Sequence, residues 1–169
     1  IKNVFFILDA LKLLKEENCK FKMIYVGEGP DFEKLKNKVI EYQLEDYIIL
    51  TGKITDRELL SFIYRRSDLL LFPSLFEGLA VVLVEAQAAG LKCITSTGVT
   101  EESNICGDVE FIDLNLEAKV WADKILKMNW SKSNNMRKII ESGYDAATNV
   151  KFLTKFYLDK YKEERTYED

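Results

Sequence analysis

The most informative absence in this sequence is histidine, which occurs nowhere among its 169 residues. A Ser-His-Asp triad and a histidine general base are therefore excluded on this chain. Cysteine is scarce and unpaired, since Cys19, Cys93 and Cys106 are widely spaced and form no Cys-x-x-Cys motif. Three such cysteines indicate reduced, buried thiols, so we expect a cytoplasmic protein.

Other absences narrow the class of protein further. The net charge of −4 leaves no basic excess to displace counterions, so we expect no nucleic-acid partner. No apolar run is long enough to span a bilayer, and no signal-peptide layout, internal repeat or low-complexity stretch is present. A chain of this length and composition forms one well-buried domain. Because Ile1 opens directly into a helical pattern without a methionine, we expect a fragment of a longer protein.

The sequence is organised around residues 73–90, P-S-L-F-E-G-L-A-V-V-L-V-E-A-Q-A-A-G. An apolar strand pattern from Asp68 to Phe72 ends at Pro73, which cannot continue a central ladder. Residues 74–78 indicate a turn. From about Leu79 the residues are apolar on nearly every side, up to a Gly90 that suits a helix C-terminus. A helix without a polar face is typical of a buried helix.

Two acidic residues lie at the N-terminal end of this predicted helix. Glu77 is on the turn, and Glu85 follows eight residues later. If the helix begins near Ala80, the amides of Leu79, Ala80 and Val81 are free donors that could bind a phosphate. Carboxylates accept hydrogen bonds from vicinal hydroxyls, so the two glutamates could bind a ribose and a sugar. Glu77 alone is better explained as a partner of the helix dipole, whereas an acid among apolar residues, like Glu85, needs a partner.

The motif E-G-L-A-V-V-L-V-E-A-Q-A-A-G resembles the two-glutamate signature of retaining glycosyltransferases of the GT-B fold, family four or group 1. The likeness is greatest to the branch of bacterial capsular and exopolysaccharide assembly. The resemblance implies that Glu85 binds the nucleotide ribose and that Glu77 binds hydroxyls of the donor sugar. It also implies that the amides from Gly78 to Val81 face the diphosphate. At Ala80 relatives often have proline or glycine, a change that keeps the backbone donor.

The resemblance extends to the start of the chain. Lys2-Asn3 resembles a pair that opens the first helix, with the lysine contacting the diphosphate. The arginine and the strand that precede it in the family would fall before residue 1. A solvated terminal charge remains the alternative for Lys2.

Two further turns resemble the family in their place along the sequence. Gly27 and Glu28, in V-G-E-G-P, would border the donor site, and Ile54 would contact the nucleotide base. The alternatives are a tight turn of positive φ for the glycine and a hydrophobic staple before a Thr55–Glu58 capping box for Ile54. Glu102 lies where relatives often have a glutamate near the sugar.

Short apolar strands alternate with helical patterns along the whole chain. We expect strands at 21–26, 47–51, 68–72, 91–96 and 109–112, and helices at 3–17, 31–41, 55–66, 79–90, 116–128, 133–143 and 145–164. The alternation predicts an α/β fold, a Rossmann-like parallel sheet with helices on both faces. By resemblance it is the C-terminal half of a GT-B fold.

The predicted sheet also predicts where the site lies. The turns at Gly27, Gly52 and Glu77 follow strand ends, so they should fall on one edge, where such sheets bind ligands. We expect one nucleotide-sugar-binding domain over residues 1–169. Residues 145–169 would form its C-terminal helix and tail, with Val150, Leu153, Tyr157 and Tyr161 inward.

The function implied by the resemblance is the donor-binding half of a retaining hexosyltransferase. It would move a hexose from a nucleotide diphosphate sugar, with a UDP-sugar expected, to a glycan or lipid-linked acceptor. Lys2, the missing arginine and the helix amides would stabilise the departing diphosphate. We therefore expect no metal and no cofactor, and the sequence has no Asp-x-Asp pair. An absent N-terminal domain would bind the acceptor, and association of the full-length protein with the inner face of the membrane stays open.

Two alternatives belong to other functional classes. A flavodoxin-like signalling module would need a phosphorylatable aspartate at a strand end, and none is placed for it. A nucleotide-sugar epimerase of GT-B architecture would share the fold, although the absence of histidine counts against it.

Overall fold

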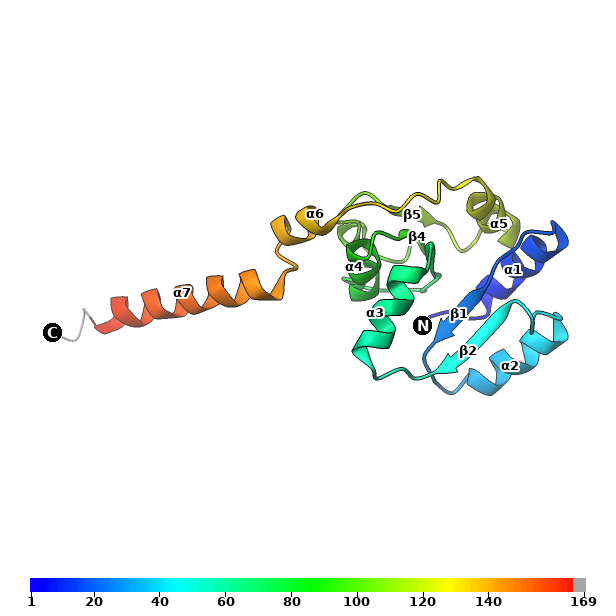
Figure 1. The fold of residues 1–169 in the computed structure, drawn as a ribbon, viewed down its shortest axis with the longest axis horizontal. Helices are drawn as coiled ribbons and strands as arrows, with labels where there is room; N and C mark the ends of the chain where they lie inside the picture. Colours follow the sequence, from blue (N-terminus) through cyan, green and yellow to red (C-terminus); the bar gives the residue numbers. More distant parts are fainter. Residues whose placement is uncertain (166–169) are drawn as a thin grey trace.

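The computed structural model describes residues 1–165, so the end of the predicted tail, 166–169, lies outside the described residues. Helices and strands alternate as the sequence predicts (Figure 1). Their bounds are α1 Phe6–Glu16, β1 Met23–Val26, α2 Phe32–Glu41, β2 Ile48–Gly52, α3 Arg57–Arg66, β3 Leu69–Phe72, α4 Val81–Ala88, β4 Lys92–Ser96, β5 Val109–Ile112, α5 Ala118–Lys127, α6 Met136–Glu141 and α7 Ala146–Arg165.

The strands pair in parallel, which confirms the predicted α/β class, but they form two sheets. One sheet has the order β1-β2 and the other β3-β4-β5. The first residues of the chain lie between the two sheets. The Tyr25 hydroxyl of β1 donates to the carbonyl of Val4 at 3.2 Å, and the amide of Leu75, after β3, donates to the carbonyl of Ile1 at 2.9 Å. The predicted single sheet is thus divided into two, and residues 1–4 lie between the parts.

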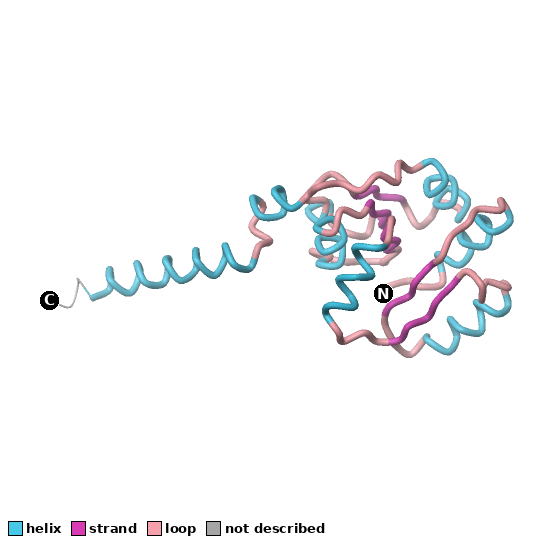
Figure 2. The backbone as a smooth tube through the Cα atoms, in the orientation of Figure 1, coloured by secondary structure: helices cyan, strands magenta, loops and turns pink. Residues whose placement is uncertain are grey.

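One hydrophobic core nevertheless joins the two sheets. It contains buried side chains from α1, α2, β2, β4, β5 and α5. Helix α1 is central to it, because Ile7, Leu8, Leu11 and Leu14 lie on one face at helical spacing and are buried. Phe6 packs edge-on against Trp121 of α5, with ring centroids 5.2 Å apart. Figure 2 shows helices on the outside of both groups of strands.

Two predicted helix starts are wrong by a few residues. Helix α3 is capped by Asp56 rather than Thr55, because the Asp56 carboxylate accepts from the amides of Glu58 at 2.8 Å and Leu59 at 3.2 Å. Helix α1 begins at Phe6, and Asn3 is not its cap since Asn3 has a φ of 50°. Aspartate and threonine both cap helices well, so the sequence alone does not choose between neighbours.

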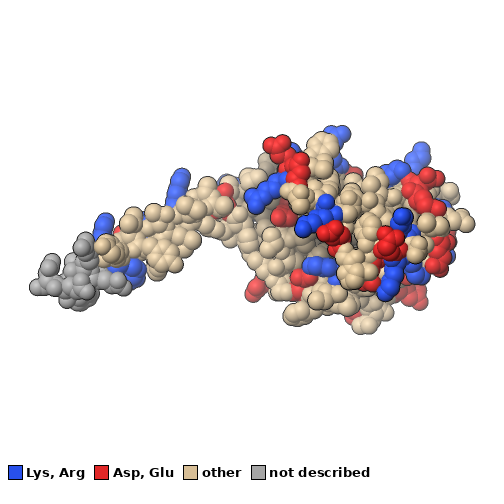
Figure 3. All heavy atoms as spheres, turned by 90° about the horizontal axis from the view of Figure 1, so that it is seen from below, with Lys and Arg blue, Asp and Glu red and all other residues tan. Residues whose placement is uncertain are grey.

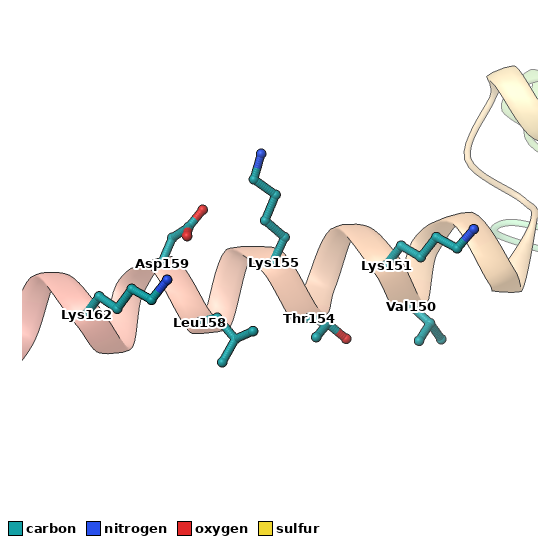
Figure 4. Close-up of a pocket in the computed structure, with 7 residues that line it drawn as sticks. All are labelled: Val150, Lys151, Thr154, Lys155, Leu158, Asp159 and Lys162. Carbon is teal, nitrogen blue, oxygen red and sulfur yellow. The ribbon is translucent and has the colours of Figure 1, made fainter.

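Helix α7 differs from the prediction most clearly. It leaves the rest of the molecule and projects away from it (Figure 1). Val150, Leu153, Tyr157 and Tyr161, expected to face inward, are 47–67% exposed. Figure 4 shows seven side chains of this helix, of which Val150 and Leu158 point to the side opposite Lys155. Apolar spacing predicts that a helix has a face to bury, but it does not say what covers that face.

Candidate functional site

The candidate site lies at the edge where β3, β4 and β5 end. Because the strands are parallel, Phe72, Ser96 and Ile112 fall on the same side of the sheet. Within β3-β4-β5, this is the edge at which α/β sheets bind ligands. The turn between β3 and α4 and the loop after β4 both leave from it, and they bring together the residues described below.

The turn between β3 and α4 is held by the loop that follows β4. The amide of Glu77 donates to the carbonyl of Gly98 at 3.1 Å, and the amide of Thr100 donates to the carbonyl of Glu77 at 3.3 Å. Gly98 permits this approach, because a Cβ there would lie 2.1 Å from the carbonyl oxygen of Leu75. The backbone of Glu77 is therefore fixed on both sides.

Helix α4 begins at Val81, one residue later than expected, and Ala80 is its N-cap. The prediction that the Ala80 amide is free is wrong, since this amide donates to Ser103 Oγ at 3.1 Å. Among residues 1–165, the amides of Leu79 and Val81 have no hydrogen-bond partner. The helix end therefore offers these two of the three expected donors, and both residues are exposed.

Glu77 and Lys2 form an ion pair at this edge. The Ser74 hydroxyl, from a completely buried residue, donates to the same Glu77 oxygen, Oε1, at 3.1 Å. The hydrogen bond from Lys2 lowers the pKa of Glu77 by more than burial raises it, and the hydrogen bond from Ser74 lowers the pKa further. Glu77 is thus a charged, half-buried carboxylate with its Oε2 atom outside these bonds. The structure therefore brings together the two residues that the resemblance implies for the reacting end of the donor.

Glu85 lies on α4 itself, and its surroundings differ from those of Glu77. The helix buries Leu83, Val84, Ala86 and Gln87, but Glu85 itself is exposed. The expectation of a helix buried all round is therefore wrong, because one side of α4, which includes Glu85, is exposed next to α3. There the Tyr64 hydroxyl donates to Glu85 Oε2 at 2.9 Å.

Gly27, Glu28 and Ile54 lie on the other sheet. Gly27 follows β1 with a φ of 136° and donates its amide to the carbonyl of Gly52 at 2.8 Å, which fits the expected tight turn. Glu28 lines a shallow hollow of about 510 Å³ at this end of β1 and β2. Within the described residues these three make no hydrogen bond or ion pair with Glu77 or Glu85.

Ile54 and Glu102 are placed without a contact that defines a role. Ile54 is half-buried in the loop before α3. Since the cap of α3 is Asp56, Ile54 no longer precedes the cap directly, so the proposed staple loses its basis. Glu102 is exposed in a short 3-10 turn, Glu101–Ser103, beside the N-terminus of α4.

Sequence reasoning missed the side chains that hold the site together. Besides Tyr64 and Ser74, the fully buried Gln87 donates to the carbonyl of Ser103 at 2.7 Å and accepts from the amide of Cys106 at 2.9 Å. Gln87 therefore fixes the loop whose serine caps α4. The only signal in the sequence was an amide side chain in an otherwise apolar helix.

Residues 1–165 contain neither a metal-ligand cluster nor a helix that could cross a membrane. No group of three or more histidine, cysteine, aspartate or glutamate side chains is arranged to hold a metal ion there. No helix in that range has the length and apolar character needed to cross a membrane. Acidic and basic side chains are intermixed on the face of the body in Figure 3.

Comparison with known proteins gives matches along most of the chain. Residues 1–146 match the family described as "Glycosyl transferases group 1". A Bacillus subtilis (strain 168) protein that bears the name glycosyltransferase EpsF is 33% identical over 93% of this chain and 41% of its own length. An Escherichia coli UDP-Gal:alpha-D-GlcNAc-diphosphoundecaprenol alpha-1,3-galactosyltransferase is 28% identical over 94% of this chain and 42% of its own. The chain thus spans about two fifths of these curated relatives.

Solved structures share the fold. The C-terminal domain of the Francisella tularensis glycosyl transferase group 1 family protein LpcC has a TM-score of 0.66 and 23% identity, covering 86% of this chain and 80% of that one. Pneumococcal O-GlcNAc transferase GtfA, solved with UDP and GlcNAc, has a TM-score of 0.65 and 24% identity, over 96% of this chain and 32% of that one. Anabaena HepE, solved with UDP, has a TM-score of 0.67 and 16% identity, over 94% and 45%.

Proposed function

Because this chain belongs to the glycosyl transferases group 1 family, we propose that it is the donor-binding part of a retaining hexosyltransferase of polysaccharide assembly. The observation behind the proposal is the arrangement at α4. The amides of the exposed residues Leu79 and Val81 are unpaired at its start, the Glu77–Lys2 pair lies on the turn before it, and Glu85 lies on the helix one turn after Val81. A diphosphate at the helix end would lie between two carboxylates that accept from hydroxyls.

The proposed orientation of the donor follows from the two partners of Glu77. Lys2 is a cation suited to the phosphate, and Glu77 is an acceptor suited to sugar hydroxyls, so their contact supports a junction of phosphate and sugar at this point. Glu85 would then bind the ribose. As the diphosphate leaves, the negative charge that develops on it would be stabilised by Lys2 and the α4 amides.

The names of the relatives and the ligands of the neighbouring structures support a UDP-sugar as donor. One relative is named for UDP-Gal and a diphosphoundecaprenol-linked acceptor, and two neighbouring structures contain UDP. We propose that the acceptor here is a glycan or a lipid-linked glycan, bound mainly by an N-terminal domain outside this chain. The site would work without a metal or other cofactor, in the cytoplasm and at the inner face of the membrane.

The alternatives from the sequence gain no support. The family match argues against a signalling module. The relatives described above bear glycosyltransferase names, and none of them is named as an epimerase.

Calorimetry tests the proposal. The 169-residue chain should bind UDP weakly and transfer no sugar alone. Glu85→Ala should weaken UDP binding about tenfold or more, since a hydrogen bond to a charged group is worth about 1.5–3 kcal/mol. A panel of UDP- and GDP-sugars with the full-length protein would identify the base.

The matched control is Glu45→Ala, which removes an exposed carboxylate from the loop between α2 and β2. It should leave UDP binding unchanged. Equal binding by wild type and Glu85→Ala would contradict the role of Glu85, and sugar transfer by the isolated chain would contradict the proposed division between two domains.

A further inference from the structure

The contact between Tyr64 and Glu85 joins two helices that are separate in sequence. Tyr64, near the end of α3, donates its hydroxyl proton to Glu85 Oε2 at 2.9 Å, across 21 residues of chain. The Tyr64 ring is partly buried and packs against the core beneath α4, which includes Leu83, Ala86 and Cys93. Packing therefore fixes the direction in which the hydroxyl points.

Tyr64 is the polar partner of Glu85, and it is a neutral one. Among the described residues Glu85 forms no ion pair, in contrast to Glu77 with Lys2. Burial raises the pKa of Tyr64 well above its usual value, and the charge of Glu85 raises it further, so the phenol keeps the proton it donates. A neutral donor orients the carboxylate and leaves its negative charge uncompensated.

The bond leaves Glu85 able to accept from a ligand. An ionised carboxylate has two oxygens with about four lone-pair directions, and Tyr64 occupies one of them on Oε2. Without that bond, an exposed glutamate loses rotamer freedom only when the ligand arrives, which weakens binding. With it, part of this ordering is already present in the free protein.

We propose that Tyr64 is a positioning residue that holds the carboxylate of Glu85 for the ribose hydroxyls of the bound nucleotide. The inference rests on the proposed function, since it assigns a role through Glu85. Tyr64 does not touch the nucleotide in this arrangement. Its effect is confined to ligands that have the hydroxyls which Glu85 binds.

The experiment compares two ligands and four proteins by calorimetry. The ligands are UDP and 2′,3′-dideoxyuridine diphosphate, which lacks both ribose hydroxyls. The proteins are the wild-type chain, Tyr64→Phe, Glu85→Gln and Tyr42→Phe. Tyr42 is the matched control, because its hydroxyl donates to Asp9 Oδ1 at the same 2.9 Å, on α1 and away from the site.

We expect Tyr64→Phe to weaken UDP binding about three- to tenfold, the range typical of a lost preorganising contact. Its affinity for the dideoxy ligand should equal that of wild type. Glu85→Gln should lose the preference for UDP more completely, and Tyr42→Phe should change neither affinity. Thermal unfolding of Tyr64→Phe in the absence of ligand checks that the variant is folded, which the retained ring packing favours.

Each other outcome overturns the inference, and the source of the failure is distinguishable. If Glu85→Gln loses the preference and Tyr64→Phe keeps it, Tyr64 does not position Glu85 although the proposed function stands. If Tyr64→Phe weakens both ligands equally, its role is only packing. If wild type binds the two ligands equally or binds neither, the proposed function fails and the inference fails with it.

Discussion

Two acids beside the β3-β4-β5 sheet have different surroundings and different partners. At the end where β4 and β5 begin, Asp108 accepts from Lys92, from Ser133 Oγ at 3.1 Å and from Asn135 Nδ2 at 2.7 Å. On the exposed side of α4, Glu85 accepts from one phenol. Asp108 is saturated by the protein itself, whereas Glu85 retains acceptor capacity.

The difference is the one that physical chemistry leads us to expect between a structural acid and an acid that binds a ligand. The Asp108 side chain is 8% exposed, and its donors come from β4 and from residues 133–135, so it fastens residues 133–135 to the sheet. Burial alone would raise the pKa of Asp108, but the hydrogen bonds from Lys92, Asn135 and Ser133 outweigh it and lower the pKa. A carboxylate that binds a ligand must instead keep lone pairs for that ligand.

The substitution with the largest expected effect on this comparison is Asp108→Ala. Removing one partner of a buried ion pair leaves Lys92 uncompensated, so the free energy of unfolding should fall by about 3–5 kcal/mol. Urea denaturation measures the change. UDP affinity of the folded fraction should be unaffected, because Asp108 lies at the end of the sheet opposite the candidate site.

The control for Asp108 is Asp123→Ala, which removes an exposed carboxylate 3.7 Å from Lys119 on α5. It should change stability by less than about 0.5 kcal/mol. An Asp108→Ala loss no larger than that of the control would remove the distinction between the two acids.

A smaller effect is expected at Glu77. Glu77→Gln keeps the size of the side chain and removes its charge, so it should abolish most of the preference for UDP-glucose over UDP, about tenfold for one charged hydrogen bond. Calorimetry with both ligands checks this. The unfolding free energy should change by less than about 1 kcal/mol, since the Lys2–Glu77 pair is partly exposed.

The pH dependence of the same preference has a definite sign. The pKa of Glu77 is lowered, so its charge is fully present above the ordinary glutamate value of about 4.3. The preference for UDP-glucose should therefore persist through neutral pH and disappear only as the pH falls through the lowered pKa. A loss of the preference between pH 7 and 5 would be inconsistent with this role.

The smallest effect is expected from Ser103→Ala, which removes the acceptor of the Ala80 amide. Loss of a hydrogen bond at a helix N-terminus costs about 1 kcal/mol, measurable by chemical denaturation. Because the bond is buried, it lies beneath the helix end rather than on its exposed side, and UDP affinity should not fall. A tenfold fall would contradict this, since it would show that nucleotide binding depends on the Ala80–Ser103 bond.

Local patterns predicted the strands and the turn at Glu77 well. β5 coincides with the predicted 109–112, and the turn at Glu77 lies at the strand ends as expected. These features depend on apolar runs and on Pro73 and Gly90, which act on their immediate neighbours.

The partners of the site residues could not be predicted in the same way. Tyr64 and Ser103 contact α4 across 21 and 23 residues of chain, and such contacts leave no periodic pattern. The division into two sheets depends on where residues 1–4 pass, which is likewise a tertiary property. Sequence reasoning therefore located the acids but not the residues that orient them.

The projecting helix α7 has a consequence for local unfolding of the chain. Side chains from Val150 to Lys162 are all exposed, so this segment takes little free energy from tertiary packing, and its order depends on a helix–coil equilibrium of its own. Backbone amides there should exchange with deuterium orders of magnitude faster than those of α1, whose apolar face is buried. Amide exchange would thus divide one continuous chain into two thermodynamic units, with the boundary between α6 and α7.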